Sequence, residues 1–404
     1  MSGFDREKQF DVIRLCQSYT QPLVDEDAAL IRDPANVRQA SANGFRKFVF
    51  LDANDIVFEE NQFAYLALPD GYDYLNEGDV IGISASTGHF RSLFRRHSDH
   101  NSFFVTERCN HYCLMCSQPP RSVDDEWLLD EIRAALPLVD RGTKAFSFTG
   151  GEPLLSPQKF IGVLNQCHEL LPQTSVHVLT NGRAFADASL ARAWSEIRHP
   201  ALSAGIPIYS AVDYIHDFVV QSKGAFDETV MGVLNLKNFG QRVEVRVVLH
   251  AVTAPRIYET CRWFSRNLPF VDHVALMGLE NTGFALANET ALDIDPLDYA
   301  MELEKGIECL ITAGMSASIY NLPRCVLPRS LWPYAVQSIS DWKRGFLAEC
   351  EECAEKQNCS GFFTTGRMKS SRGISKILKT DSHSHEAEAV VNTSQSTAKA
   401  SAVR

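Results

Sequence analysis

The sequence predicts an α/β protein built on a partial (β/α)6 barrel, with a small β-rich domain before it and a cysteine-rich region after it. From Ser102 onward, apolar runs of strand length alternate with segments of helical periodicity, which indicates βα units and a parallel sheet. Repeated right-handed crossovers would curl that sheet into a partial barrel. Seven of the eleven cysteines fall in two groups, one after the first barrel strand and one after the last.

The composition is that of a soluble globular protein. The chain has 404 residues, of which 45% are hydrophobic and 22% charged. It has no apolar run of about 18 residues and no apolar signal core after Met1, so we expect a cytoplasmic protein without a membrane partner. A net charge of −11 argues against nucleic acid as a partner. In a long chain without a signal, cysteines indicate metal ligation or catalysis rather than a disulfide scaffold.

Residues 1–100 are predicted to form the β-rich domain. Short apolar alternations at 46–51 and 63–68 are separated from the next segment by turn signals at 70–71 and 77–79. The Arg and His residues of segment 88–97 could contact a peptide or an anion, but a solvated strand face is the favoured interpretation.

The barrel is predicted over residues 101–315. Its strands are expected at six apolar runs: 102–106, 144–149, 175–180, 206–212, 243–252 and 272–279. A helix is expected after Ser156, with Ser156 as N-cap and Pro157 at the first helical position. Sites in such folds lie at the carboxyl ends of the strands.

A helix at about 296–313 and a strand at 316–320 lead into the cysteine-rich region, 316–368. Residues 369–404 are rich in Ser, Thr, Ala, Lys and Glu, cannot bury a core, and are predicted to be disordered. His383 and His385 in that tail are interpreted as solvated rather than as metal ligands. The four remaining thiols are interpreted as packed side chains: Cys16, Cys167, Cys261 and Cys309.

The first cysteine group has the spacing C-x3-C-x2-C and consists of Cys109, Cys113 and Cys116. Three thiolates on one short loop can hold a [4Fe-4S] cluster by three corners and leave one iron open, which is the mark of a reactive centre. A zinc knot would need a fourth ligand, for which only His111 is near. Three buried cysteines acting as small hydrophobes would scatter rather than cluster.

The second group has the spacing C-x24-C-x2-C-x5-C and consists of Cys325, Cys350, Cys353 and Cys359. Four cysteines can close a complete metal site. Spacing alone leaves two occupants open, a zinc ion held by four thiolates and a fully ligated [4Fe-4S] cluster.

At the end of the second barrel strand, Gly150 and Gly151 allow the backbone to approach a ligand closely, although a tight βα turn would use glycine equally well. The C-x3-C-x2-C loop followed by the segment Thr149-Gly150-Gly151-Glu152-Pro153 resembles the radical S-adenosylmethionine (radical SAM) superfamily. Membership would imply that the open iron chelates SAM, and that an electron from the cluster splits SAM into methionine and a 5'-deoxyadenosyl radical. Met115 departs from the aromatic residue that the family more often has before the third cysteine.

The resemblance also implies which residues hold SAM. The segment Gly150, Gly151, Glu152 and Pro153 would bind the amino group, while Asn181, Ser210 and Asp213 would hold the ribose hydroxyls and the carboxylate. Arg246, which alternates with Glu244 on the fifth strand, could pair with that carboxylate, and Met277 could contact the adenine. A turn hydrogen bond, or for Met277 an ordinary core position, is the alternative for each.

The second cysteine group resembles part of the SPASM motif, the auxiliary-cluster region of peptide-modifying radical SAM enzymes. Phe363 stands where that motif would place its next cysteine, so one auxiliary cluster is expected, with Cys325 as the distant ligand. Together with residues 106–110, 113–120 and 338–343, the chain resembles the C-type radical SAM maturase of the His-Xaa-Ser system over about residues 45–366.

This resemblance implies modification of a small ribosomally made peptide with His-Xaa-Ser repeats. Its implied partners are a second radical SAM maturase and an electron donor such as flavodoxin or ferredoxin. Two other functions stay open, namely a radical SAM enzyme acting on a small molecule or RNA, and a non-catalytic iron-sulfur or peptide-carrier protein.

Overall fold

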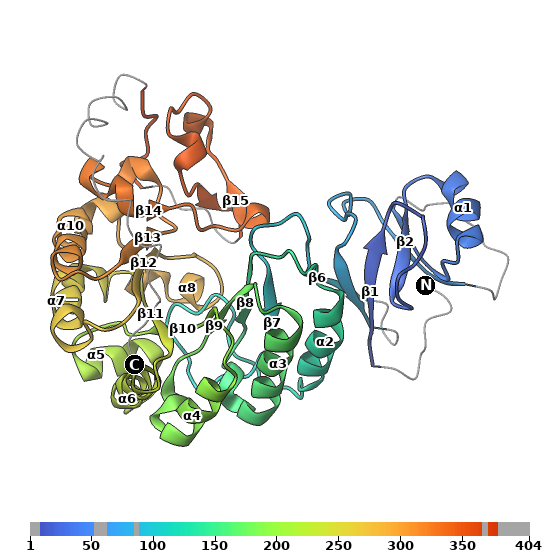
Figure 1. Cartoon of the computed structure of the whole chain (residues 1–404). Helices are drawn as coiled ribbons and strands as arrows, with labels where there is room; N and C mark the ends of the chain where they lie inside the picture. The colour runs from blue at the N-terminus through green and yellow to red at the C-terminus, as the bar shows by residue number, and fades with distance from the viewer. Residues whose placement is uncertain (1–8, 52–62, 85–88, 366–370, 379–404) are drawn as a thin grey trace, which may run out of the picture.

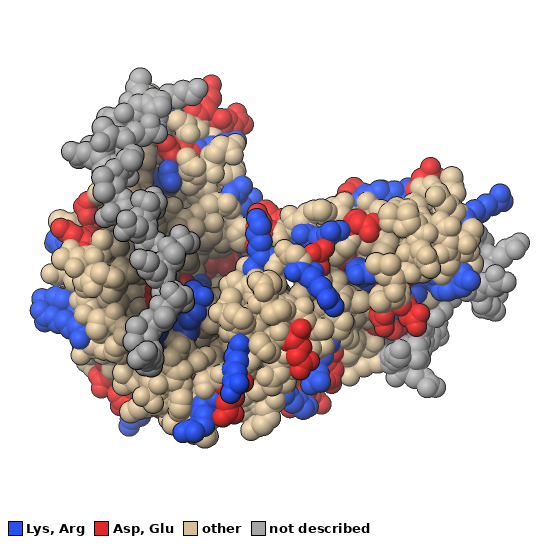
Figure 2. All heavy atoms as spheres, in the orientation of Figure 1, with Lys and Arg blue, Asp and Glu red and all other residues tan. Residues whose placement is uncertain are grey.

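The computed structural model describes residues 9–51, 63–84, 89–365 and 371–378. Its described elements form two large sheets, one in the N-terminal part and one in the barrel, and a two-stranded ribbon in the cysteine-rich region (Figure 1). Lys, Arg, Asp and Glu side chains are interspersed over the face seen in Figure 2. None of the helices within the described ranges is long and apolar enough to cross a membrane.

The N-terminal sheet has six strands in the order β4-β3-β2-β1-β5-β6. The first four are parallel, whereas β5 and β6 pair antiparallel. The strands expected at 46–51 and 63–68 are confirmed as β3 and β4. The element bounds are β1 Asp11–Cys16, β2 Asp27–Ile31, α1 Val37–Ala42, β3 Lys47–Leu51, β4 Ala64–Leu68, β5 Val80–Ile83 and β6 Phe90–Phe94.

The barrel sheet has eight strands in strict chain order from β7 to β14, and every neighbouring pair is parallel. The sheet curls, with its helices on the outer side (Figure 1). This confirms the predicted α/β partial barrel with a separate β-rich N-terminal sheet. The strands are β7 Ser102–Phe104, β8 Ala145–Thr149, β9 Ser175–Leu179, β10 Leu202–Pro207, β11 Arg242–Leu249, β12 His273–Gly278, β13 Ala317–Tyr320 and β14 Ala335–Val336.

The helices follow the strands as expected, and α3 begins at Pro157. Ser156 precedes it but makes no side-chain cap hydrogen bond, because its hydroxyl donates to Glu126 at 3.4 Å instead. The helices are α2 Trp127–Ala135, α3 Pro157–Leu170, α4 Ala188–Glu196, α5 Asp213–Val220, α6 Ala225–Asn238, α7 Ile257–Asn267, α8 Phe284–Ala287, α9 Glu289–Leu292 and α10 Pro296–Thr312.

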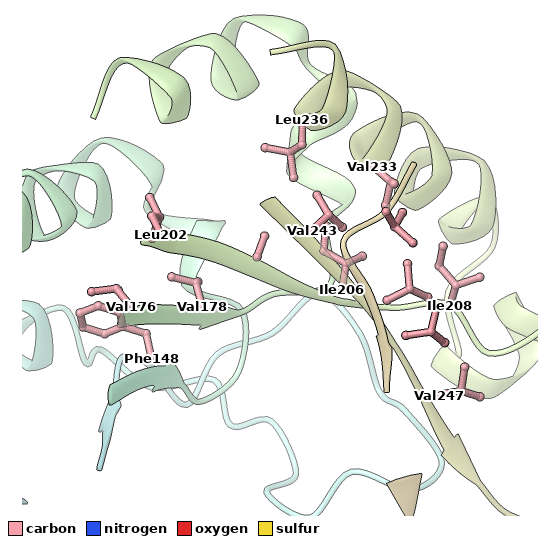
Figure 3. Close-up of a cluster of buried hydrophobic side chains, with 14 of the residues drawn as sticks. Phe148, Val176, Val178, Leu202, Ile206, Ile208, Val233, Leu236, Val243 and Val247 are labelled. Carbon is pink, nitrogen blue, oxygen red and sulfur yellow. The ribbon is translucent and has the colours of Figure 1, made fainter. Parts of the chain in front are cut away.

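The two sides of the barrel sheet differ in chemistry. On β11, Val243, Val245 and Val247 are fully buried, and Figure 3 shows Val243 and Val247 within a cluster of buried apolar side chains. The alternate residues Glu244 and Arg246 are only partly buried. Closed barrels fill their interior with branched apolar side chains. This partial barrel instead has an interior with charged and partly exposed side chains.

The fourth barrel strand lies earlier than predicted. The apolar run suggested 206–212, but β10 is Leu202–Pro207. Ser203 and Gly205 have short side chains and are not typical strand residues, so the sequence contained no strand signal there. Both nevertheless pair with β11. A β-carbon on Gly205 would lie 2.5 Å from Nε2 of His177, so the small residue is required by packing.

The cysteine-rich region consists mainly of short 3-10 turns and the antiparallel ribbon of β15 Arg344–Gly345 and β16 Phe362–Phe363. Residues 371–378 pack against this region, although they belong to the stretch predicted to be disordered. His383 and His385 lie outside the described residues.

Candidate active site

The cysteine loop, residues 109–116, is held by backbone hydrogen bonds on two sides. The amides of Tyr112 and Leu114 donate to the carbonyls of Val220 and Val219 at the end of α5, at 3.1 and 2.9 Å. On the other side, the Phe284 amide at the start of α8 donates to the Cys116 carbonyl at 2.8 Å. The loop is therefore placed by elements more than a hundred residues downstream of it in the sequence.

The residues before the loop, 106–108, run alongside the end of β8. The amides of Gly151 and Glu152 donate to the carbonyls of Thr106 and Arg108, at 2.7 and 2.8 Å. A β-carbon on Gly151 would lie only 1.9 Å from the Arg108 carbonyl oxygen, and one on Gly150 would lie 2.6 Å from that of Thr106. The two glycines are thus needed for contact between the two segments, in addition to any contact with a ligand.

Asp125 organises the same residues and was not singled out from the sequence. Its carboxylate accepts from the Thr106 hydroxyl at 2.9 Å, the Glu107 amide at 2.5 Å and Nε of Arg108 at 3.0 Å. The side chain is buried. The sequence does not distinguish Asp125 from its neighbours, because it lies in the polar segment between the cysteines and α2, next to the exposed Asp124.

We expect Asp125→Ala to lower the free energy of unfolding by about 3–5 kcal/mol, the cost of leaving a buried charged network without one partner. Asp124→Ala is the matched control and should change it by less than about 0.5 kcal/mol, because Asp124 is exposed. Urea unfolding of both variants measures the difference. Equal midpoints would contradict the role given to Asp125.

Glu152 and Asn181 tie the ends of β8 and β9 to the cysteine loop. The Glu152 carboxylate is 1% exposed and accepts from the Leu154 amide at 2.9 Å, the Thr180 hydroxyl at 2.7 Å and the Asn181 amide at 2.6 Å. Burial raises its pKa, and these hydrogen bonds partly offset the rise. The Asn181 side chain donates to Oδ1 of Asn110 at 2.6 Å. Glu152 is therefore a positioning residue whose oxygens are already engaged.

The three thiols of the cysteine loop influence one another. Burial raises the pKa of Cys109 to about 11, while the His111 amide, which donates to its sulfur at 3.4 Å, lowers it. Burial raises the pKa of Cys113, and the neighbouring Cys116 and Cys109 raise it further. Metal ligation requires the thiolate form, so binding of a metal centre at these three cysteines would release their protons.

The four cysteines of the second group also lie together. Burial raises the pKa of Cys325 and of Cys350, and Cys359 adds to the rise in both; Cys353 adds to that of Cys350. Among the described residues, no three His, Cys, Asp or Glu side chains are arranged to hold a single metal ion. Four thiolates are the ligand set both of a zinc ion and of a fully ligated [4Fe-4S] cluster.

The remaining predicted SAM contacts have the following partners in the structure. Ser210 is buried and accepts from the Val212 amide at 3.0 Å, and Asp213 is exposed at the start of α5, where it accepts from the Tyr214 amide at 2.7 Å. Arg246 donates to Sδ of Met277 at 3.1 Å and pairs with Glu244. Arg246 and Met277 therefore contact each other.

Arg246 belongs to a polar network inside the barrel that the sequence did not reveal. The Glu244 carboxylate lies 2.8 Å from Nδ1 of His273 and 3.4 Å from Nε2 of His177. Burial opposes ionisation, yet hydrogen bonds from both histidines and the charge of Arg246 hold the pKa of Glu244 well below its usual range. The alternation of residues on β11 predicted that Glu244 and Arg246 share one face of the strand. It could not predict their partners, which come from β9 and β12.

Residues 103–264 match the family model described as the Radical SAM superfamily. Over 146 residues the chain is 29% identical to molybdenum cofactor biosynthesis protein 1 of Bos taurus. That match spans 35% of this chain and about a fifth (22%) of the curated relative.

Two solved structures are similar in part. One is Streptococcus suis SuiB bound to the precursor peptide SuiA, at 12% identity and a TM-score of 0.44, over 56% of this chain and 49% of that one. The other is a radical SAM methyltransferase from Sphaerobacter thermophilus, at 15% identity and a TM-score of 0.41, over 60% and 73%.

Proposed function

We propose that the chain is a radical SAM enzyme that modifies a small ribosomally made peptide of the His-Xaa-Ser type. The observation that carries the radical SAM part is the pairing of Gly151 and Glu152 with the residues that lead into three mutually close thiols. A [4Fe-4S] cluster with SAM on its open iron would supply the radical that abstracts hydrogen from the peptide.

The chain's own residues would hold and orient these groups. Cys109, Cys113 and Cys116 are the proposed cluster ligands, and the Gly150–Pro153 segment lies beside them to receive the amino group of SAM. Asn181, Ser210, Asp213, Arg246 and Met277 remain proposed contacts for the rest of SAM.

A cleft of about 510 Å³ supports an extended substrate. It lies where the ends of β11, β12 and β13 meet the cysteine-rich region. Its wall combines apolar side chains such as Leu279 and Phe362 with polar ones such as Asn281 and Asn321. Mixed walls of this kind suit a peptide, whose side chains and backbone need both.

The auxiliary cysteines, Cys325, Cys350, Cys353 and Cys359, would bind a second [4Fe-4S] cluster. A second radical SAM maturase and a flavodoxin- or ferredoxin-type electron donor are the partners proposed from the resemblance.

A second candidate function is supported by the similarity to the bovine protein, whose name describes cofactor biosynthesis. Under it, the same radical chemistry would act on a small molecule. The two candidates differ in which substrate changes mass during turnover.

The test incubates anaerobically reconstituted protein with SAM, dithionite and a synthetic peptide carrying His-Xaa-Ser repeats. We expect a mass change in the peptide, and no change in a matched peptide with His and Ser replaced by Ala. If SAM is cleaved but neither peptide accelerates cleavage or changes mass, the peptide substrate is wrong and the small-molecule candidate gains support.

A further inference from the structure

Residues 371–378, here called the strap, join the barrel to the auxiliary cysteines. At one end, the Ser371 hydroxyl and the Arg372 amide donate to the Asp295 carboxylate at 2.7 and 2.9 Å. Asp295 is the N-cap of α10, where it also accepts from the Leu297 amide at 3.0 Å. The strap therefore starts from a fixed point on the barrel.

The other end of the strap lies against the auxiliary cysteines. The Ile377 amide donates to Sγ of Cys353 at 3.4 Å, and the Ile377 carbonyl accepts from the Ala354 amide at 2.9 Å. Burial raises the pKa of Cys325, and a hydrogen bond from the Ser375 backbone partly offsets that rise. Two of the four auxiliary cysteines thus receive a backbone N–H from the strap.

Two further contacts fix this end in place. The Ile377 side chain is 8% exposed, which is unusual in a segment so poor in large apolar residues. Lys376 pairs with Glu352, the residue before Cys353, at 2.8 Å. An exposed ion pair adds little by itself, so the burial of Ile377 and the backbone bonds are what hold the strap.

We propose that the strap is a structural part of the auxiliary site, closing it from solvent and raising the reduction potential of the cluster bound there. This rests on the proposed auxiliary [4Fe-4S] cluster. Hydrogen bonds to cluster sulfurs and exclusion of solvent both set cluster potentials. An N–H group directed at a sulfur stabilises the more negative, reduced state, so its loss lowers the potential.

Two pairs of variants separate the two effects. A chain ending at residue 370 lacks the strap, whereas one ending at residue 378 keeps the strap and lacks only residues 379–404. Ile377→Pro removes the N–H that reaches Cys353 but leaves the carbonyl, and Ile377→Val keeps both. Each is reconstituted anaerobically as the full enzyme, then assayed for iron, for potential by redox titration with electron paramagnetic resonance, and for iron loss to a chelator.

We expect the chain ending at 370 to lose iron to the chelator several-fold faster, and Ile377→Pro to titrate at a lower potential. The chain ending at 378 and Ile377→Val should match the full chain. All four should still cleave SAM, because no hydrogen bond or ion pair joins the strap to the cysteine loop within the described residues.

Unchanged potential and unchanged iron loss in both the 370 chain and Ile377→Pro would overturn the role of the strap. The full chain itself tests the premise, since two clusters require about eight irons per chain. If it holds only about four, all removed by replacing Cys113, then the auxiliary cluster of the proposed function is wrong, whatever the strap does.

Discussion

Cys113→Ala is expected to abolish reductive cleavage of SAM. Cys113 is the middle ligand of the proposed cluster. The other two thiols of the loop lie close enough to raise its pKa. Without Cys113 only two protein ligands remain, and a second iron of the cluster would lack a protein ligand. Since removing even an outer-shell partner of a metal site costs about 10–100-fold, we expect a loss beyond about a hundredfold. The measurement is 5'-deoxyadenosine released after reduction, quantified by chromatography.

Two controls give this result its meaning. Cys261→Ala removes a fully buried thiol far in sequence from both groups and should keep cleavage. Cys353→Ala alters the auxiliary group and should spare SAM cleavage while peptide modification is lost. Equal loss of cleavage in Cys113→Ala and Cys353→Ala would contradict the proposed division of labour between the two groups.

The second large effect is expected for Gly151→Ala. Its β-carbon would meet the Arg108 carbonyl oxygen at 1.9 Å, and the atoms it meets belong to the backbone and cannot rotate away. The segment before Cys109 must therefore move, and the hydrogen bond from Gly151 to Thr106 would be strained or lost. We expect destabilisation of about 1–3 kcal/mol from overpacking. SAM cleavage should fall by at least about a hundredfold, because small displacements at reacting centres have costs of that size.

Gly162→Ala is the matched control. Gly162 lies within α3, and a β-carbon there would meet only the end of the flexible Arg133 side chain, at 3.3 Å. Alanine in a helix interior stabilises by about 0.5–1 kcal/mol relative to glycine. A Gly151→Ala protein that binds iron and cleaves SAM at the normal rate would show that the glycine is not needed there.

Periodicity was sufficient to predict six strands of the barrel, because these are apolar runs flanked by amphipathic helices. The barrel sheet has two more strands: β13, which was expected as a strand but assigned to the cysteine-rich region, and β14, which was not predicted. Periodicity also misplaced β10, because Ser203 and Gly205 interrupt its apolar run. Gly205 packs closely against His177, and the Ser203 hydroxyl lies 2.9 Å from Nδ1 of the same histidine. Periodicity also gave no sign that residues 371–378 pack, since one buried Ile377 and a few backbone bonds hold a segment of otherwise polar composition.

At the site, spacing predicted which residues come together locally, and it could not predict partners from distant strands. The cysteine loop and Gly150–Gly151 were found because their motifs are contiguous. Asp125 was missed because its hydrogen bonds run backward to residues 106–108. The pairing of Glu244 with His177 and His273 depends on the register of three strands, which a single sequence does not contain.

The most direct test of the account is the product of anaerobic reduction. Protein reconstituted with iron and sulfide, then given SAM and dithionite, is predicted to release 5'-deoxyadenosine, with none from Cys113→Ala. Absence of 5'-deoxyadenosine from protein whose cluster is intact by absorption and electron paramagnetic resonance spectroscopy would contradict the account.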